Sequence, residues 1–403
     1  MCIDALRSAP LLALFLLLPC IGGEPTNGLQ FEERLIAGGY GYAYGIAAVD
    51  IDGDGDLDVT SADTRRDVLY WYENDGKGNF SRRIVRDAEP GWFERHAVGD
   101  LNGDGLPDIV VVKNLEGHLV WFENNGKPGL DKDWTRHVLT TDLKRAYDVV
   151  LVDLNADGRL DVAAAAWNGN YHAWFANPGP GKFDEEWKKE MIDQEIGETR
   201  TIATADFNGD KKPDLLGTAR IGNLTAWYEQ TGDAARPWKR HVIDDQSPLP
   251  VHGQPIDMDG DGDPDVVMAL GMHASEGMQN TNQIVWYENP RSRDNATGEN
   301  RAWKKHLIGP MPYGFEVYPG DLDGDGDLDV AATAWGGAGQ IAWFENPGQA
   351  GGEWKRHALK EPWNRANQVL IADLDGDRRL DILASAEVGA NEVRWWKNLG
   401  AKK

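Results

Sequence analysis

The sequence predicts an all-β fold, namely a seven-bladed β-propeller of four-stranded blades. Three observations lead to this prediction: an aspartate-rich motif recurs seven times, each repeat carries the same further features, and the N-terminal segment completes the last repeat. The motif is first seen as VDIDGDGDLDV at residues 49–59. Its first aspartates are Asp50, Asp100, Asp153, Asp206, Asp257, Asp321 and Asp373. Their spacing of about 50 residues is typical of one propeller blade.

Each repeat is predicted to contain four strands. An apolar run such as DIVVVK at 108–113 follows the motif, and an aromatic pair with polar residues, such as WYEN at 71–74, comes next. A segment such as WTRHVL at 134–139 ends the repeat. Apolar runs bounded by turn residues are typical of strands that are packed on both faces. We therefore expect the order strand, aspartate loop, strand, turn, aromatic strand, loop and strand.

The seventh repeat shows how the ring closes. It stops at VRWWKNLGAKK, residues 393–403, and has no segment of the last type. The segment FEERLI at 31–36 has that pattern and precedes the first repeat. We therefore expect the N-terminal strand to complete the last blade of a propeller that spans residues 31–400, because a closed ring leaves no exposed sheet edge.

The N-terminus has the features of a secretory signal peptide. Arg7 precedes an apolar run from Leu11 to Leu18, and small residues follow. The run is too short to cross a bilayer, so no transmembrane segment is expected in the mature chain. We predict a signal peptide at 1–23, a linker at 24–30 and a secreted or cell-surface protein. The sequence LLPC leaves open a lipid anchor on Cys20.

Composition excludes some classes of partner. Hydrophobic residues make up 41% of the chain, which is too much for a disordered protein. The formal net charge of −25 argues against nucleic acid and anionic membranes, because phosphate binding needs clustered Lys and Arg. Both cysteines, Cys2 and Cys20, lie in the predicted leader, so the mature domain cannot form an internal disulfide. Calcium is the stabilising element that we expect in its place.

The aspartate motif is a candidate calcium loop. Acidic side chains at positions 1, 3 and 5 of a tight loop converge on one point, aided by a backbone carbonyl at position 7. In the first loop these residues are Asp50, Asp52, Asp54 and the carbonyl of Asp56, with Asp58 at position 9 as a further side chain. Gly55 at position 6 permits the bend. An EF-hand does not fit, because position 12 is never Glu in the seven loops and the flanks are predicted strands. Simple aspartate-rich turns are the alternative.

The period, the loop and the apolar strand resemble the FG-GAP/VCBS repeat family, best known from the propeller head of integrin α-subunits. The resemblance covers nearly all of the mature chain. It implies that each loop joins the first two strands of a blade on the lower face and binds calcium, so that up to seven ions are held. The implied ligands of the other loops are Asp100, Asn102, Asp104 and Asp108; Asp153, Asn155, Asp157 and Asp161; Asp206, Asn208, Asp210 and Asp214; Asp257, Asp259, Asp261 and Asp265; Asp321, Asp323, Asp325 and Asp329; and Asp373, Asp375, Asp377 and Asp381.

Two loops depart from this pattern. Lys211 and Arg378 replace the glycine at position 6 in the fourth and seventh loops. Because each adds a cation and a Cβ atom, we expect weaker or empty sites at the loops that begin at Asp206 and Asp373.

Ligand-binding residues are expected on the face opposite the aspartate loops, where segments differ between repeats. Residues that the repeat does not require are the better functional candidates, although any one of them can be an ordinary loop residue. The candidates are Arg95, His96, Arg145, Arg200, His252, His273, Glu316 and Arg365, with Trp167 and Trp335 as stacking surfaces. The tryptophans of the aromatic strands, such as Trp71, are expected to pack between blades.

Three functions remain open. The first is a secreted calcium-binding propeller that recognises a carbohydrate or an extracellular protein, the role that integrin-like propellers imply. The second is a carbohydrate lyase or dehydratase acting by β-elimination, with His96 or His252 as base and Arg145 or Arg200 as carboxylate clamp. The pattern WYENP followed by W-x-R-H-x-I is similar to the propeller part of aldos-2-ulose dehydratases, which favours this reading. The third is a structural cell-surface module without a small ligand.

Overall fold

The computed structural model describes residues 28–126, 134–232, 237–274, 278–279, 281–290, 302–349 and 352–402. The predicted signal peptide at 1–23, Cys20 and most of the predicted linker lie outside this range. Within the described residues, no helix is long and apolar enough to cross a membrane.

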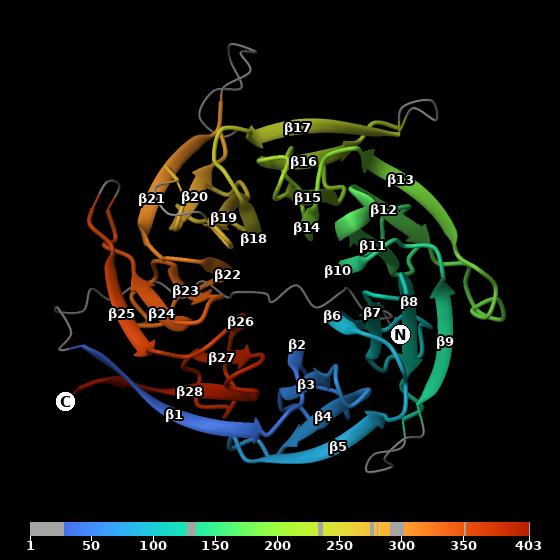
Figure 1. Ribbon diagram of the computed structural model, residues 1–403, viewed down its shortest axis with the longest axis horizontal. Helices are drawn as coiled ribbons and strands as arrows, with labels where there is room; N and C mark the ends of the chain where they lie inside the picture. Colours follow the sequence, from blue (N-terminus) through green and yellow to red (C-terminus); the bar gives the residue numbers. More distant parts are fainter. Residues whose placement is uncertain are drawn as a thin grey trace, which may run out of the picture.

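Seven four-stranded antiparallel sheets surround a central axis, as Figure 1 shows. The prediction of a seven-bladed propeller is therefore confirmed. Blades 1 to 6 contain β2–β5, β6–β9, β10–β13, β14–β17, β18–β21 and β22–β25, and blade 7 contains β26–β28 with β1. The strands of the described residues are β1 Leu29–Gly38, β2 Ala43–Val49, β3 Asp58–Asp63, β4 Val68–Asn74, β5 Phe80–Arg86, β6 Phe93–Gly99, β7 Asp108–Lys113, β8 His118–Glu123, β9 Thr135–Thr140, β10 Ala146–Val152, β11 Asp161–Ala166, β12 Tyr171–Ala176, β13 Lys188–Gln194, β14 Thr199–Ala205, β15 Asp214–Ala219, β16 Leu224–Gln230, β17 Trp238–Asp244, β18 Pro250–Ile256, β19 Asp265–Leu270, β20 Gln283–Glu288, β21 Lys304–Pro310, β22 Gly314–Gly320, β23 Asp329–Ala334, β24 Gln340–Glu345, β25 Lys355–Lys360, β26 Ala366–Ala372, β27 Asp381–Ala386 and β28 Glu392–Ala401.

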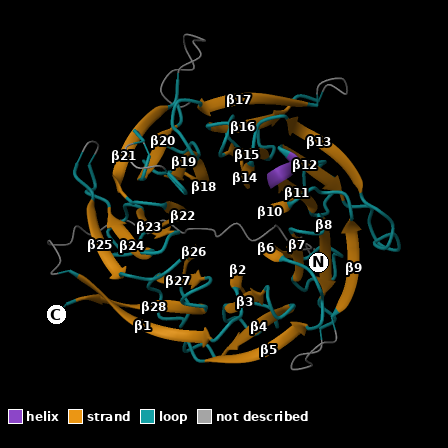
Figure 2. Cartoon of the chain, viewed as in Figure 1, coloured by secondary structure: helices purple, strands orange, loops and turns teal. Residues whose placement is uncertain are grey.

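The place of each strand in its blade follows from its sequence. The second strand of every blade is apolar or small in character and fully buried, as in β7, because neighbouring blades cover both of its faces. The fourth strand carries charged residues and lies at the rim of the ring in Figure 1, as β17 does. One helical turn, η1 Trp167–Gly169, interrupts the β-structure of the described residues (Figure 2).

The two ends of the chain close the ring. Strand β1 pairs antiparallel with β28, so that Leu29 lies opposite Ala401 and Gly38 opposite Glu392. In Figure 1 these two strands run side by side although they come from opposite ends of the colour scale. This pairing confirms the prediction that the N-terminal strand completes the last blade.

The core lies between the blades. Trp121, for example, is fully buried in a cluster that combines residues of blade 2 with Ala164 and Phe175 of blade 3. Its indole stacks on the imidazole of His137 with a centroid distance of 4.3 Å. Similar tryptophan–histidine stacks occur at Trp227 in blade 4, at Trp286 in blade 5 and at Trp343 in blade 6. The prediction that these tryptophans are core residues is therefore confirmed for Trp121 and Trp343, which are at most 2% exposed.

Candidate functional site

The aspartate loops curl around their own carboxylates. In the first loop, Asp50 accepts hydrogen bonds from the backbone N–H groups of Gly53 at 2.8 Å, Asp54 at 3.1 Å and Gly55 at 3.0 Å. Gly53 and Gly55 have φ values of 78° and 100°, which favour glycine. The loop therefore brings its acidic side chains together before any ligand is considered.

Four of the seven loops bring three carboxylates within 4.8 Å of one another in the described residues. Their carboxylates are Asp50, Asp52 and Asp58; Asp257, Asp259 and Asp265; Asp321, Asp323 and Asp325; and Asp373, Asp375 and Asp381. Carboxylate oxygens are the ligands that calcium prefers, so the donor set of these loops fits the ion. The loops that begin at Asp100, Asp153 and Asp206 carry an asparagine at position 3, which supplies an amide oxygen there.

The aspartate at position 9 has a structural role that the sequence did not suggest. Asp58 accepts hydrogen bonds from the backbone N–H of Ile51 at 3.0 Å and of Asn74 at 2.7 Å. Burial raises the pKa of Asp58 to about 7, although these hydrogen bonds oppose the increase. The side chain of Asn74 in turn donates to the carbonyl of Leu374 in blade 7. Position 9 and the last residue of the aromatic strand therefore join the loop to its own blade and to the preceding one.

The two loops without glycine at position 6 keep the same backbone. Lys211 and Arg378 have φ values of 66° and 70°, in the left-handed region that glycine favours. Their N–H groups still bond to Asp206 at 2.9 Å and to Asp373 at 2.8 Å, as Gly55 does to Asp50. The substitutions therefore add charge and local strain without unfolding the loop.

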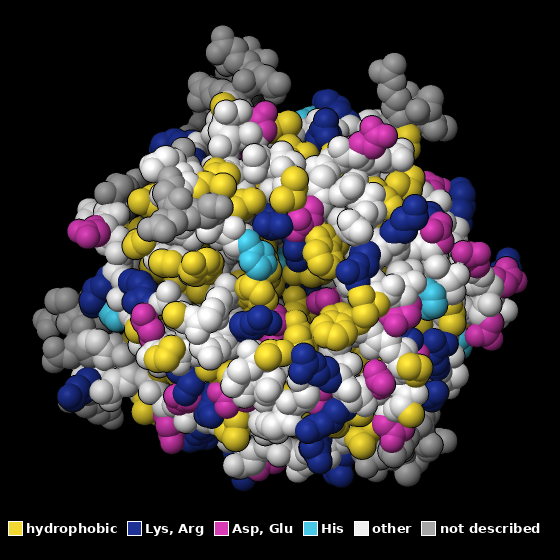
Figure 3. Space-filling view, in the orientation of Figure 1, with side chains coloured by type: hydrophobic (Ala, Val, Ile, Leu, Met, Phe, Trp, Pro, Cys, Tyr) yellow, Lys and Arg dark blue, Asp and Glu magenta, His cyan; other side chains and the backbone are white. Residues whose placement is uncertain are grey.

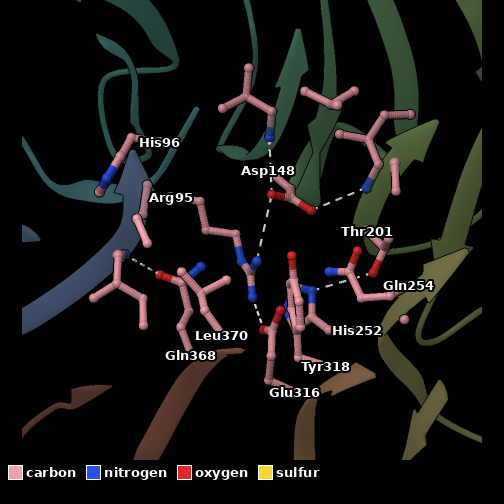
Figure 4. Close-up of a pocket in the computed structure, with 18 of the residues that line it drawn as sticks. Arg95, His96, Asp148, Thr201, His252, Gln254, Glu316, Tyr318, Gln368 and Leu370 are labelled. Atoms are coloured by element: carbon pink, nitrogen blue, oxygen red, sulfur yellow. Dashed lines mark hydrogen bonds and ion pairs between the residues drawn. The ribbon is translucent and has the colours of Figure 1, made fainter. Parts of the chain in front are cut away.

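A layer of polar side chains crosses the central channel. The inner strands place a different polar residue five positions before the first aspartate of six of the seven loops. These six residues, which we call the polar tier, are Arg95, Asp148, Thr201, His252, Glu316 and Gln368. They line a cavity of about 310 Å³, and Figure 4 labels all six of them. Apolar residues such as Ala48 and Ala372, which lie shortly before aspartate loops in the sequence, form much of the remaining wall.

Arg95 is the centre of the polar tier. Its guanidinium forms an ion pair with Glu316 and lies 3.8 Å from the carboxylate of Asp148. The side chains of all three residues are at most 10% exposed. Burial raises the pKa of Glu316 to about 7, although Arg95 opposes the increase. The tier thus contains a buried charge network that joins three blades, as Figure 4 shows.

A chain of hydrogen-bonded side chains lies beside this network. The hydroxyl of Tyr147 is 3.1 Å from the hydroxyl of Tyr44 and 3.3 Å from Nε2 of His252. Nδ1 of His252 is 3.3 Å from the hydroxyl of Thr201. Burial lowers the pKa of His252 well below its usual value, and the charges of Arg95 and Arg200 add to this effect. His252 is therefore neutral at pH 7.

At the mouth of the channel, on the side of the polar tier away from the aspartate loops, arginines stack on aromatic rings. The guanidinium of Arg200 lies 4.5 Å from the ring centroid of Tyr147 and 4.7 Å from that of Trp167. Arg145 lies 5.2 Å from the same Trp167 ring. Glu198 forms ion pairs with Arg200 and, at 2.6 Å, with Arg220. This side of the channel mouth is therefore rich in cations held against an indole.

The opposite side of the mouth repeats this chemistry. Arg365 lies 4.6 Å from the ring centroid of Trp335, and the ring of His273 lies 4.7 Å from it. The indole N–H of Trp335 donates to Glu387. In the space-filling view of Figure 3, basic, acidic, histidine and hydrophobic side chains meet around a hollow at the centre of the ring.

Trp92 and Tyr42 complete the mouth between these two sides. Their rings are 4.9 Å apart, and the indole N–H of Trp92 donates to Glu94 at 2.9 Å. Burial raises the pKa of Glu94 to about 8, and the charge of Glu387 adds to the effect. The mouth therefore contains a carboxyl group that is largely protonated at pH 7.

The structure brings all ten predicted ligand-binding residues to the channel, in three groups. Arg95, His96, His252 and Glu316 line the cavity, whereas Arg145, Arg200 and Trp167 form one cluster at the mouth and His273, Trp335 and Arg365 form another. His96 bonds to the hydroxyl of Thr60 at 2.6 Å, and burial lowers its pKa to about 4. Its ring lies beside Gly45 and Thr60 of blade 1.

Sequence reasoning missed several residues of the same site. They are Tyr42, Tyr44, Trp92, Glu94, Tyr147, Asp148, Glu198 and Glu387. The signal that could have found the strand residues is a polar or aromatic side chain whose type changes from repeat to repeat at the same inner-strand position. Such a residue departs from the repeat at a buried position. The fold alone does not require this departure.

Comparison with known proteins agrees with the fold. The model of the FG-GAP-like repeat matches residues 50–111, 100–164, 153–217, 257–332 and 321–384. No curated protein matches the chain.

Solved structures show a similar architecture at low sequence identity. Virginiamycin B lyase from Staphylococcus aureus is 12% identical over 92% of this chain and 99% of that one, with a TM-score of 0.58. BBS1N in complex with ARL6DN is 12% identical over 94% of this chain and 99% of that one, with a TM-score of 0.55. At this identity the likeness concerns the fold alone.

Proposed function

This chain belongs to the FG-GAP-like repeat family, and from this premise we propose that it is an extracellular calcium-binding propeller that recognises a carbohydrate at its channel mouth. The observation that carries the proposal is the arrangement at the mouth. Three partly buried tryptophans, Trp92, Trp167 and Trp335, surround it, and arginine or glutamate side chains contact each of them.

This combination suits a sugar. The C–H faces of a sugar ring pack on aromatic rings, and its hydroxyl groups bond to the planar polar groups of Arg, Glu and Gln. A flat protein surface makes few contacts with a concave mouth of this kind, whereas a small ligand is surrounded by it. We therefore favour a carbohydrate over an extracellular protein as the partner.

The charges at the mouth favour an acidic sugar. Arg145 and Arg200 hold their guanidinium groups on Trp167, and Arg145 donates to Asn114 at 3.1 Å. Guanidinium groups bind carboxylates in a planar, bidentate manner. A uronate or another sugar carboxylate is therefore the ligand that we expect at this side of the mouth.

Calcium has a structural role in this proposal. The aspartate loops lie at the end of the inner strands opposite the mouth, and their carboxylates repel one another unless a cation binds. A bound ion neutralises this charge and holds its loop in the conformation that joins neighbouring blades.

A second candidate function is β-elimination from a uronate. The hydrogen-bonded chain of Tyr44, Tyr147 and His252 next to Arg200 is the observation that favours it. In such a reaction a base removes the proton next to the carboxylate, a double bond forms, and the leaving oxygen takes a proton as its bond to carbon breaks. Tyr147 and neutral His252 are the groups that can move these protons.

Both proposals can be tested with the same saccharides. Titration calorimetry with neutral and uronate-containing oligosaccharides should show saturable binding, stronger for the uronates. If neither class binds, carbohydrate recognition is wrong. Formation of unsaturated sugars, monitored by ultraviolet absorbance, would support the lyase function. Binding without any increase in absorbance would support recognition and contradict the lyase function.

A further inference from the structure

One position next to the aspartate loops changes its charge between blades. It is the penultimate residue of the aromatic motif, just before the asparagine or glutamine that joins the loop to its blade. Five blades have glutamate there, namely Glu73, Glu123, Glu229, Glu288 and Glu345. Blade 3 has Ala176, and blade 7 has Lys397.

In blades 2 and 7 the side chain at this position contacts position 3 of the loop. In blade 2, Oε1 of Glu123 accepts a hydrogen bond from the amide of Asn102 at 3.1 Å. In blade 7, Nζ of Lys397 forms an ion pair with Asp375 and lies 3.6 Å from Oδ2 of Asp377. These aspartates are positions 3 and 5 of the seventh loop, the positions expected to hold an ion.

The lysine is enclosed with its partner. The side chain of Asp375 is 3% exposed and that of Lys397 is 20% exposed. Asp375 is also a member of the carboxylate cluster with Asp373 and Asp381. The ammonium therefore points into the same group of carboxylates that would surround a metal ion.

A second cation takes part in the seventh loop. Arg379 pairs with Asp377 and donates through Nε to the carbonyl of Asn398 at 2.8 Å. The first loop differs, because no ion pair joins its aspartates to a basic side chain in the part of the chain that the structure describes. The residue equivalent to Lys397 there is Glu73, a carboxylate that pairs with Arg83 of the outer strand β5 at 2.6 Å. A bound cation offsets the repulsion between an extra carboxylate and an acidic loop. An ammonium at the same place repels a divalent ion and so weakens its binding.

We infer that the ammonium of Lys397 occupies the place of calcium in the seventh loop, so that this loop is held by an internal cation and takes no metal ion. The inference rests on the calcium binding proposed for the other loops. It identifies Lys397, in addition to the substitution at Arg378, as the reason for an empty site.

The seventh loop lies where the ring closes, so Lys397 affects the contact between the last and the first blade. Blade 7 is the blade in which β1 and β28 join the two ends of the chain. In addition, Asn74 of blade 1 donates to the carbonyl of Leu374, the second residue of the seventh loop, at 2.7 Å. In the proposed arrangement, the loop that contacts blade 1 is therefore held by an internal cation and not by calcium.

Reciprocal charge exchange tests the inference. The measurement is the number of calcium ions bound per chain, determined by equilibrium dialysis and elemental analysis. Lys397→Glu, which restores the residue of five other blades, should bind one ion more than the wild type. Glu345→Lys, which places the lysine in blade 6, should bind one ion fewer. If the wild type binds calcium and Lys397→Glu binds the same number, the inference is overturned and the proposed function stands.

A second measurement works without any metal. In excess chelator, Lys397→Met should lower Tm by ~3 °C or more, because it leaves the buried Asp375 without its cation. The matched control is Lys355→Met, since Lys355 pairs with Glu345 at 3.1 Å but is 64% exposed. An equal Tm for both variants would overturn the role of Lys397. If the wild type binds no calcium at all, the calcium part of the proposed function fails, and this measurement still decides the role of the lysine.

Discussion

Arg95 of blade 2 and Glu316 of blade 6 form an ion pair across the central channel, although 221 residues separate them in the sequence. Both side chains are less than 10% exposed, and Asp148 of blade 3 lies beside them. The contacts of Tyr147 with Tyr44 and His252 also join blades that are not neighbours, so the Arg95–Glu316 pair is one of several direct links between distant blades. It also separates the aromatic mouth from the cavity that extends towards the aspartate loops.

Removing one partner of this pair should destabilise the protein strongly. Arg95→Met leaves Glu316 and Asp148 buried without their cation, which costs about 3–5 kcal/mol. The double variant Arg95→Met with Glu316→Gln should recover part of the loss, since one uncompensated carboxylate is then removed. Chemical denaturation measures both values. Equal destabilisation by the single and double variants would contradict the proposed coupling.

The stability of the protein should depend on pH through Glu94. Burial raises the pKa of Glu94 to about 8, so its contribution to the free energy of unfolding is present at low pH and is lost as pH rises towards that value. Glu94→Gln keeps an acceptor for Trp92 and cannot ionise. The stability of this variant relative to the wild type should therefore increase between pH 5 and pH 9, by on the order of 3 kcal/mol.

The control for the pH experiment is Glu32→Gln, because the side chain of Glu32 is 50% exposed on the outer strand β1. Its relative stability should change little over the same range. A constant difference between Glu94→Gln and the wild type at all pH values would show that Glu94 is not held protonated.

Carbohydrate affinity should depend on Arg145. Arg145→Ala removes the guanidinium that lies on Trp167 and should weaken binding of a uronate oligosaccharide by about tenfold or more, since hydrogen bonds to charged groups contribute about 1.5–3 kcal/mol. The matched control is Arg240→Ala, because Arg240 is a partly exposed arginine on the outer strand β17 that pairs with Asp193. Calorimetric affinities that fall equally in both variants would place the binding site elsewhere.

Calcium removal should lower the thermal stability of the whole propeller. Chelation leaves several clusters of carboxylates unneutralised on the face of the aspartate loops, so Tm should fall and should recover when calcium is added back. Asp54→Asn, which weakens the first loop alone, should reduce the Tm increase that calcium produces. An unchanged Tm after chelation would show that the loops do not stabilise the fold through calcium.

Much of the architecture could be predicted because it repeats. The motif beginning at Asp50 returns in every blade, and the absence of an outer segment after Trp396 pointed directly to FEERLI as its replacement. The acidic loops were predicted for the same reason, since their geometry is local and short. The structural role of Asp58 was missed because its partners, Ile51 and Asn74, come from the loop and a different strand.

The candidate site could be predicted only in part. Arg95 and Glu316 stood out as departures from the repeat, but no spacing in the sequence indicates that they meet. Tyr147 and Glu94 were not selected because aromatic and acidic residues are ordinary in loops, and only the ring shows that they enter the channel.

The sequence by itself therefore determined the number of blades, the order of strands within a blade, the closure by the N-terminal strand and the position of the acidic loops, since each of these follows from local pattern and period. Only the tertiary structure decided which side chains meet at the axis and that the side chain of Lys397 contacts the seventh loop. Closing the ring brings residues hundreds of positions apart within contact distance, and burial there changes their protonation and pairing in ways that no local pattern encodes.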